Sequence, residues 1–224
     1  MSPPVTFIQC LGGQAPCVSG CLRSTGNIRV SRTSIPVQTD SGALIAIGGN
    51  WPPDPGHIVE TIVSTICDID QEIGRIVSVS RFYKTPAFPE GAGPDFVNAA
   101  MRVDTILDVR DCLERLHGIE ARYGRERQNR WGARTLDLDL LALGQAVHPD
   151  PITQSEWRNM GFERQTHEAP DQLILPHPRL QDRAFVLIPL ADIAPDWPHP
   201  LTKETVASML SALPESEKAA ICPL

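Results

Sequence analysis

The sequence lacks the features that mark membrane proteins and general nucleic-acid binders. No apolar run approaches the ~20 residues that a membrane-spanning helix needs, and no basic segment followed by an apolar one resembles a secretory signal. The 224 residues carry a formal net charge of −7, and only 5% are aromatic. An acidic chain with few stacking rings disfavours non-specific binding to nucleic acid or an anionic membrane. We expect a cytoplasmic monomer with neither kind of partner.

Several common catalytic motifs are also missing. The chain contains no G-x-x-x-x-G-K-[ST], G-x-G-x-x-G, H-E-x-x-H or G-x-S-x-G, so any ATP chemistry would proceed without a Walker phosphate loop. Six cysteines are present, but none form a C-x-x-C pair. Neither a disulfide scaffold nor a common zinc site is therefore predicted.

Proline is abundant but unevenly placed. Of the 21 prolines, none lies between Pro94 and Pro149, so residues 95–148 can form unbroken regular structure. Residues 1–42 are rich in Pro, Gly, Ser and Thr without a clear period, which predicts a disordered N-terminal tail. Residues 43–224 are expected to form a single domain, with residues 149–170 as an insertion loop.

Hydrophobic periodicity predicts four strands and two helices before the insertion. Isoleucines from Ile58 to Ile73 recur every three or four residues, which is typical of an amphipathic helix that ends at Gly74. A second helical pattern begins after Asp108, a suitable N-cap. Alternating or continuous apolar runs indicate the strands. Strands are expected over 43–48, 76–85, 96–103 and 135–143, and helices over 58–73 and 109–123.

The resulting β-α-β-β-α-β order predicts an α+β protein with a ferredoxin-like core. Its sheet should be antiparallel and both helices should cover one face. The C-terminal part should add further α/β structure, with helices near residues 182–190 and 203–213.

Two carboxylates stand out on the last predicted core strand. Asp is unfavourable in strands, yet Asp137 and Asp139 lie two residues apart, so they share one face while Leu136, Leu138 and Leu140 turn to the core. Hard oxygen ligands of this kind suit Mg²⁺ together with substrate phosphates. A half-exposed strand with a polar outer face explains the same pattern, and both interpretations stay open.

An arginine-rich segment directly precedes this strand. Five arginines in residues 122–134, set against Glu126, Asp137 and Asp139, give residues 122–139 a net charge of +2. Arginine forks suit phosphate oxygens, although cations also favour a helix C-terminus without any ligand. Beside the two aspartates, these arginines form a set that could bind a polyphosphate.

Other side chains allow a functional or a structural interpretation. Glu120, near an apolar helix stripe, could pair with an arginine or face a pocket. Phe96 and Asn98 share a strand face and could recognise a flat heterocycle. Trp131 lies in a loop, and His177 lies between two prolines where it could donate to phosphate.

Four segments of the chain resemble the 6-hydroxymethyl-7,8-dihydropterin pyrophosphokinase family of the folate pathway, in the family's order. The third segment is the most specific, because R-W-G-x-R-T-x-D-x-D defines seven positions. Gly49 stands where the family usually has Ser, and His117 where Gln is common. The segments are IAIGGN (45–50), FYKTPAFPEGAGPDFVNA (82–99), GRERQNRWGARTLDLDLL (124–141) and LPHPRLQDRAFVLIPL (175–190).

The resemblance implies Mg-dependent transfer of pyrophosphate from ATP to the hydroxymethyl group of the pterin, which yields the pterin diphosphate and AMP. Asp137 and Asp139 would hold two Mg²⁺ ions, and Arg125 and Arg134 would close on the phosphates. ATP, the co-substrate, would contact Glu120, Arg127, Trp131, Leu140, His177 and Arg183. The pterin would contact Thr85, Pro86, Phe88, Phe96, Asn98 and Phe185. Residues 49–56, 86–95 and 122–134 would act as lids.

Two other hypotheses remain at this point. A ferredoxin-like regulatory or RNA-binding module would need aromatic residues and a basic sheet face, whereas the candidate strands carry acids, one Phe and an Asn. A catalytically inactive family member is the other alternative, although the aspartate pair and both loop arginines are present.

Overall fold

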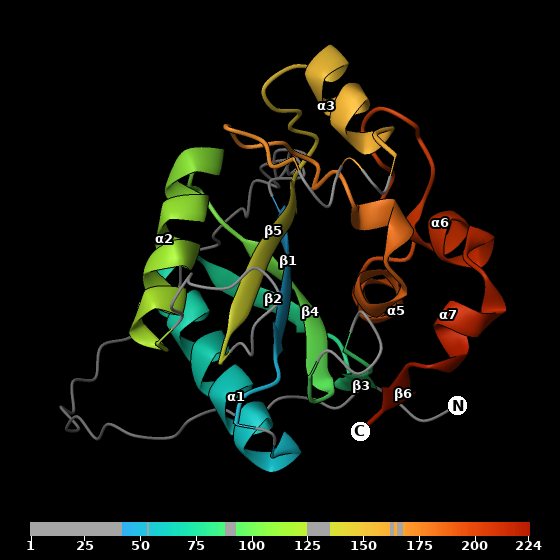
Figure 1. Ribbon diagram of the computed structural model, residues 1–224. Helices are drawn as coiled ribbons and strands as arrows, with labels where there is room; N and C mark the ends of the chain where they lie inside the picture. Colours follow the sequence, from blue (N-terminus) through green and yellow to red (C-terminus); the bar gives the residue numbers. More distant parts are fainter. Residues whose placement is uncertain (1–41, 53, 88–92, 125–134, 162–163, 165–167) are drawn as a thin grey trace, which may run out of the picture. The chain divides into compact units, whose positions relative to one another are not determined.

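The computed structural model describes residues 42–52, 54–87, 93–124, 135–161, 164 and 168–224. In these residues a mixed sheet-and-helix fold places one sheet between two layers of helices (Figure 1). The strands are β1 (Gly42–Gly49), β2 (Arg75–Val79), β3 (Tyr83–Thr85), β4 (Phe96–Asp104), β5 (Asp137–Leu143) and β6 (Cys222–Pro223). The helices are α1 (Pro55–Glu72), α2 (Val109–Arg122), α3 (Pro151–Arg158), α5 (Ala184–Ile193), α6 (Val206–Ala212) and α7 (Glu215–Ala219), with a 3₁₀ turn at Leu180–Asp182.

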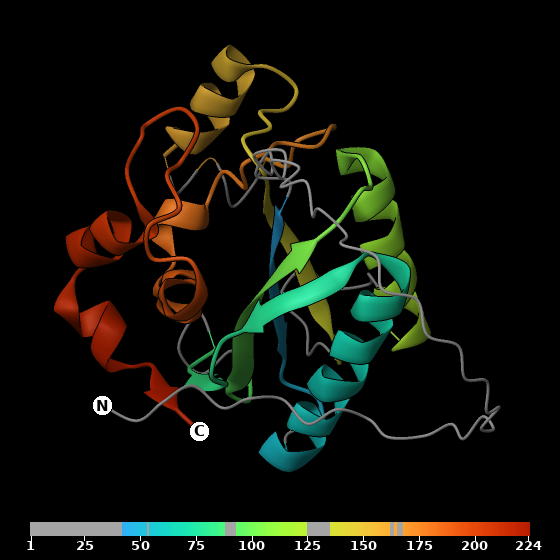
Figure 2. The ribbon, with the colours of Figure 1, turned by 180° about the vertical axis from the view of Figure 1, so that it is seen from behind.

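The sheet has the order β5-β1-β4-β3-β6, and β2 pairs with the other half of β4. Every pairing is antiparallel. The core order β1-α1-β2/β3-β4-α2-β5 confirms the predicted ferredoxin-like arrangement. The short β6 at the outer edge of β3, seen from behind in Figure 2, was not expected from the sequence.

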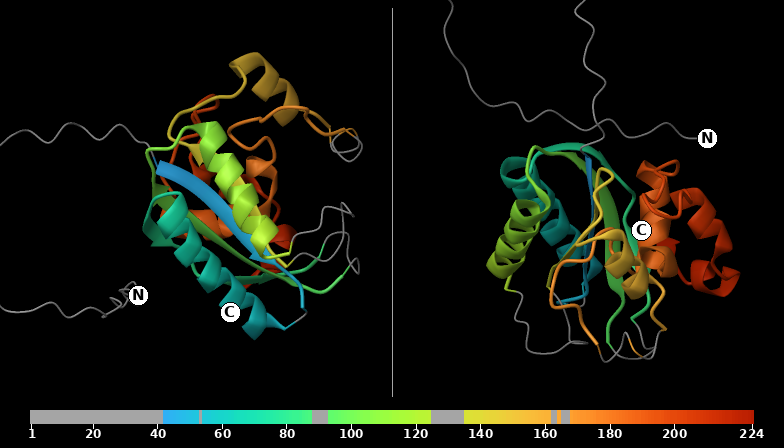
Figure 3. Two further views of the ribbon diagram at one scale, coloured as in Figure 1. Left: turned by 90° about the vertical axis from the view of Figure 1, so that its left-hand side faces the viewer. Right: turned by 90° about the horizontal axis from the view of Figure 1, so that it is seen from above.

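Helices α1 and α2 cover one face of the sheet, as predicted, and α5 and α6 cover the other (Figure 3). On the first face, the isoleucines of α1 and the apolar stripe of α2 pack against inward residues of β1, β4 and β5. On the second face, Val186, Leu187 and Leu190 of α5 pack with Leu44 and Ala100. Because alternate residues of each strand point to opposite faces, the sheet separates two hydrophobic cores.

Local signals in the sequence explain where the two core helices begin and end. The Asp54 carboxylate accepts the Gly56 N–H at 3.0 Å ahead of Pro55 in α1, and the Asp108 carboxylate accepts the Asp111 N–H at 2.9 Å, which confirms the predicted cap of α2. After α1, a Cβ on Gly74 would lie 2.2 Å from the carbonyl oxygen of Asp104. Only glycine fits this close approach between the chain after α1 and the end of β4, and this requirement explains the glycine directly after the helix.

The predicted strand 76–85 is in fact two strands. Between β2 and β3, the Ser80 N–H donates to the Ala100 carbonyl at 2.9 Å, while the Ser80 hydroxyl accepts the Ala100 N–H at 2.9 Å. A side-chain oxygen thus takes the place of a backbone carbonyl, and the ladder is interrupted. The chain resumes its pairing at Tyr83. The continuous run of β-branched and aromatic residues predicted one strand and did not indicate this break.

Part of the expected insertion loop, residues 149–170, is helical. The carboxylate of Asp150 caps α3 by accepting the N–H groups of Ile152 and Thr153 at 2.8 and 3.0 Å. On α3, the buried Gln154 donates its amide to the Pro176 carbonyl at 3.1 Å. The Asp-Pro pair at residues 150–151 is a helix-start signal that the loop prediction overlooked.

Helices α5 and α6 lie close to their predicted positions. The predicted N-terminal tail falls outside the described residues except for Gly42, which begins β1. Within the described part of the chain, no helix combines the length and apolar character needed to cross a membrane.

Candidate active site

One row of residues crosses the sheet from β5 to β3. Asp137 pairs with Gly48, Gly48 with Asn98, and Asn98 with Tyr83. Directly paired residues of neighbouring strands point to the same face, so these side chains all lie on the α5 face of the sheet. Asp139 joins them two residues further along β5, opposite Ala46. The prediction that both aspartates share one face, with Leu136, Leu138 and Leu140 in the core, is confirmed.

The Asn98 side chain lies over Gly48. A Cβ added to Gly48 would be only 2.1 Å from the Asn98 Oδ1, so glycine is what leaves room for the amide oxygen over β1. The Asn98 Nδ2 donates to the Thr85 hydroxyl oxygen at 2.7 Å. Thr85 is buried and Asn98 is half-buried. Sequence reasoning did not single out Gly48, although its block IAIGGN contained the signal.

The aromatic and proline candidates lie on β4, just after β3 and at the start of α5. Phe96 is the register partner of Thr85 and is partly exposed, and Pro86 is exposed just beyond Thr85. Phe185, in the first turn of α5, is 38% exposed. A partly exposed ring at a helix start beside polar groups is suited to contact a ligand rather than to fill a core.

Arg183 lies at the start of α5, next to both aspartates. Burial, with the positive charge of Arg179, lowers the pKa of its guanidinium overall, against the opposing effect of the negative charges of Asp139 and Asp137. The guanidinium also lies 5.6 Å from the centre of the Phe185 ring. The structure therefore brings Arg183 and Phe185 to the carboxylate face.

His177 is held by its backbone and by its ring. Its N–H donates to the Leu141 carbonyl at 2.9 Å, and its Nδ1 accepts the Arg179 N–H at 3.1 Å. Burial, together with the charges of Arg183 and Arg179, lowers the pKa of His177 to about 3, against a smaller opposing effect of Asp137. The ring is therefore neutral at pH 7, with its proton on Nε2 because Nδ1 is an acceptor.

Two predicted ATP contacts have buried side chains, one beside the edge of β5 and one on its other face. Glu120 is 1% exposed, and its Oε1 accepts the Leu138 N–H at 2.7 Å. Leu140 is 4% exposed in the core under α1 and α2. The structure thus does not bring these side chains to the carboxylate face. Five further candidates lie outside the described residues: Phe88, Arg125, Arg127, Trp131 and Arg134.

The carboxylate pair suits magnesium better than zinc. Asp137 and Asp139 offer hard oxygen ligands on one face, and no group of three or more His, Cys, Asp or Glu side chains gathers as a metal site in the described ranges. Mg²⁺ is commonly held by one or two carboxylates, with water and substrate phosphates as the other ligands. Structural zinc sites use four protein ligands rich in Cys and His.

These features define a ferredoxin-like α+β protein whose second sheet face carries an acidic pair, a half-buried arginine and an ordered Thr–Asn pair. Residues 44–195 match the family model of 7,8-dihydro-6-hydroxymethylpterin-pyrophosphokinase (HPPK). The chain belongs to this family. This match confirms the resemblance noted in the sequence.

Individual relatives agree with the family assignment. The chain is 33% identical over 182 residues to a Synechocystis sp. protein, a match that covers 81% of this chain and 80% of that protein. It is 37% identical over 142 residues to a Methylorubrum extorquens protein, which covers 63% and 76% of the two chains. Both relatives are named 2-amino-4-hydroxy-6-hydroxymethyldihydropteridine pyrophosphokinase.

Solved structures confirm the fold. An HPPK-DHPS crystal structure in complex with substrates superposes with a TM-score of 0.55 at 16% identity, over 78% of this chain and 44% of that one. Wild-type Plasmodium falciparum HPPK-DHPS with pteroate gives 0.53 at 15% identity, over 76% and 42%. The chain thus spans less than half the length of these two proteins, and at such identities the likeness concerns the fold alone.

Proposed function

We propose that this chain is a 6-hydroxymethyl-7,8-dihydropterin pyrophosphokinase of folate biosynthesis. It transfers pyrophosphate from ATP to the pterin hydroxymethyl group and releases AMP. The observation that carries this proposal is the row across the sheet, in which Asp137 and the Asn98–Thr85 pair lie on one face. A carboxylate that can bind a metal–polyphosphate complex therefore lies in the same row of the sheet as an amide that can bind a heterocycle.

At the phosphate end, Asp137 and Asp139 would hold Mg²⁺, with two ions expected. Bound Mg²⁺ would supply neutralisation of the polyphosphate charge. Arg183 donates charged hydrogen bonds to phosphate oxygens, and the neutral His177 donates through Nε2. Arg125 and Arg134 are proposed to add further positive charge as the arginine segment closes, with Arg127 and Trp131 as additional ATP contacts.

At the pterin end, Asn98 supplies its remaining amide N–H as a donor and its Oδ1 as an acceptor for the edge of the ring. Thr85 orients that amide through the 2.7 Å hydrogen bond. Phe96 and Phe185 offer ring faces for stacking, and Pro86 and Phe88 complete the proposed pocket. The nucleophile is the substrate's own hydroxyl, so the chain contributes position and charge rather than a covalent intermediate.

The structure suggests different parts for Glu120 and Leu140. Both were expected to contact ATP, but the side chain of Leu140 is buried on the other face of β5 and that of Glu120 is buried beside its edge. We propose that Glu120 positions the metal-binding strand, because its partner Leu138 lies between the two aspartates. Leu140 would then act through core packing.

The test is AMP formation by the purified protein with ATP, Mg²⁺ and 6-hydroxymethyl-7,8-dihydropterin. We expect Asp137→Asn and Asp139→Asn each to lower the rate at least ~100-fold while circular dichroism and melting temperature stay near wild type. Asp104→Asn is the matched control, because Asp104 pairs with Arg75 at the far end of β4.

Each outcome of this test is decisive. No AMP above a blank without enzyme would overturn the proposed function and favour an inactive family member or a binding module. Full activity in both aspartate variants would remove these carboxylates from the site while leaving the activity itself established.

A further inference from the structure

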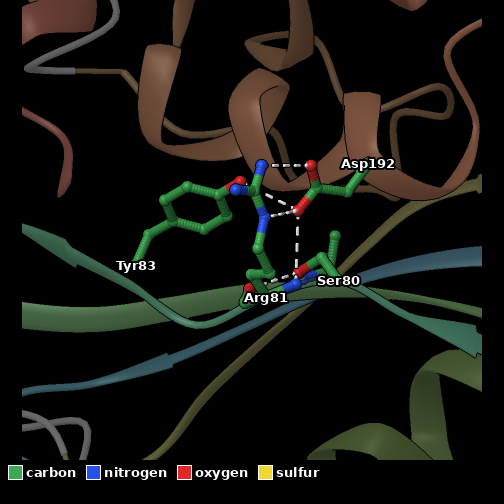
Figure 4. Close-up of polar contacts among 5 residues, drawn as sticks. Ser80, Arg81, Tyr83 and Asp192 are labelled. Carbon is green, nitrogen blue, oxygen red and sulfur yellow. Dashed lines mark hydrogen bonds and ion pairs between the residues drawn. The ribbon is translucent and has the colours of Figure 1, made fainter. Parts of the chain in front are cut away.

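A second polar cluster lies on the α5 face, next to Asn98 in the strand register, and none of its members is itself a proposed substrate contact. Asp192, near the end of α5, accepts four hydrogen bonds (Figure 4). Arg81 donates its backbone N–H at 3.2 Å, its Nε at 3.1 Å and its Nη2 at 2.8 Å, and Tyr83 donates its hydroxyl at 2.8 Å. We call Arg81, Tyr83 and Asp192 the Asp192 clamp.

The clamp is more than an exposed ion pair. The Arg81 side chain is 66% exposed, so the Arg81–Asp192 pair alone would contribute little. Tyr83, in contrast, is 3% exposed, and its hydroxyl would be left without this acceptor if Asp192 were removed. Burial and the bond to Asp192 raise the pKa of Tyr83 to about 12, so the phenol remains a donor at pH 7.

The two elements that the clamp joins both carry proposed pterin contacts. On α5, Phe185 precedes Asp192 by seven residues, which places both on one side of the helix about 10 Å apart along its axis. On β3, Thr85 follows Tyr83 by two residues and shares its face. The clamp therefore connects the side of the pocket that holds Thr85 to the side that holds Phe185.

Other contacts hold α5 more firmly than β3. Helix α5 buries Val186, Leu187 and Leu190 in the second core, whereas β3 has three residues and is bordered by the two-residue β6. A strand this short gains little stability from its own backbone hydrogen bonds to its neighbours. Apolar packing is also non-directional and tolerates sliding, whereas the hydrogen bonds of Asp192 specify one position of β3 against α5.

We propose that the Asp192 clamp is a positioning device for the pterin pocket, and that it sets the place of Thr85, and through it Asn98, relative to Phe185. This inference rests on the proposed function. Its consequence is selective: loss of the clamp frees β3, which carries pterin contacts, while the metal-binding aspartates remain on β5 at the other side of β1 and β4.

The test compares Michaelis constants for the two substrates in the full-length protein. We expect Asp192→Ala to raise the KM for the pterin about tenfold and the KM for ATP less than about twofold. Tyr83→Phe, which keeps the ring, should raise the pterin KM about threefold. Asp192→Glu restores a carboxylate and should recover part of the loss. Asp104→Asn again serves as the control.

A double-mutant cycle separates a direct clamp effect from general destabilisation. Because Tyr83 acts through Asp192, adding Tyr83→Phe to Asp192→Ala should not raise the pterin KM further. Equal rises in both KM values, or a wild-type pterin KM in an active Asp192→Ala enzyme, would overturn the clamp while the proposed function stands. A wild-type protein that forms no AMP would overturn both.

Discussion

The hydrogen bond between Glu120 and Leu138 leads to the most specific prediction about stability. Glu120 is 1% exposed in α2, and its Oε1 accepts the backbone N–H of Leu138 at 2.7 Å. Leu138 lies between Asp137 and Asp139 on β5. Substituting Glu120 should therefore affect both the free energy of unfolding and the affinity for Mg²⁺.

The size of the effect follows from the groups that lose their partners. A hydrogen bond in a protein contributes about 0.5–1.5 kcal/mol, and a buried N–H without a partner costs about 1–3 kcal/mol. We therefore expect Glu120→Ala to lower the free energy of unfolding by about 3 kcal/mol. For a chain of this size, that corresponds to about 6–12 °C in melting temperature. Glu120→Gln keeps an acceptor oxygen and should cost less than about 1.5 kcal/mol.

The assays are urea unfolding followed by circular dichroism, and AMP formation titrated with Mg²⁺. Glu114→Ala is the control, because Glu114 is exposed on the same helix and should change stability by less than about 0.5 kcal/mol. In Glu120→Ala, half-maximal activity should require several times more Mg²⁺ than in wild type. If Glu120→Ala unfolded within about 0.5 kcal/mol of wild type, the proposed role of this carboxylate in holding β5 would be refuted.

Two further predictions concern the pterin side of the site. In Gly48→Ala, the new Cβ would lie 2.1 Å from the Asn98 Oδ1, so the amide must move away from Thr85. The pterin KM should therefore rise at least about tenfold. An unchanged pterin KM would contradict this geometry. Its control is Gly118→Ala, since a Cβ there meets nothing within 4 Å and alanine should stabilise the helix by about 1 kcal/mol. The second prediction is a pH dependence: burial raises the pKa of Asp192, but the hydrogen bonds from Arg81 and Tyr83 outweigh it and lower the pKa overall. A lowered folded-state pKa means that the clamp stabilises the fold above the unfolded pKa of about 3.9 and loses this effect as the pH falls below it. The stability difference between wild type and Asp192→Asn in urea should therefore be larger at pH 7 than at pH 3, and a constant difference would argue against an ionised Asp192 in the clamp.

The core elements could be predicted because their signals are local. The isoleucine spacing of α1, the Asp108 cap of α2 and the alternation along β5 each report one buried side and one exposed side. Periodicity of this kind is imposed by the geometry of the element itself. It was sufficient to place Asp137 and Asp139 on a common face before any tertiary contact was known.

The misplaced expectations depended on contacts between distant residues. The break after β2 arises from Ser80 bonding to Ala100, twenty residues away. The position of the Glu120 carboxylate likewise depends on a distant contact, because it accepts the backbone N–H of Leu138 on the edge strand β5. Helix α3 differs, because its start is encoded locally by an Asp-Pro pair and does not depend on a distant contact.

The sequence alone determined the order of the core elements, the family and the common face of Asp137 and Asp139, because each is encoded in short-range periodicity or in contiguous motifs. The tertiary structure decided which of those residues meet. The Asn98 amide lies over Gly48 because antiparallel pairing sets them side by side. Asp192 reaches Arg81 and Tyr83 across more than one hundred residues because α5 packs on the open sheet face. Such juxtapositions arise from packing and register, which no local pattern records.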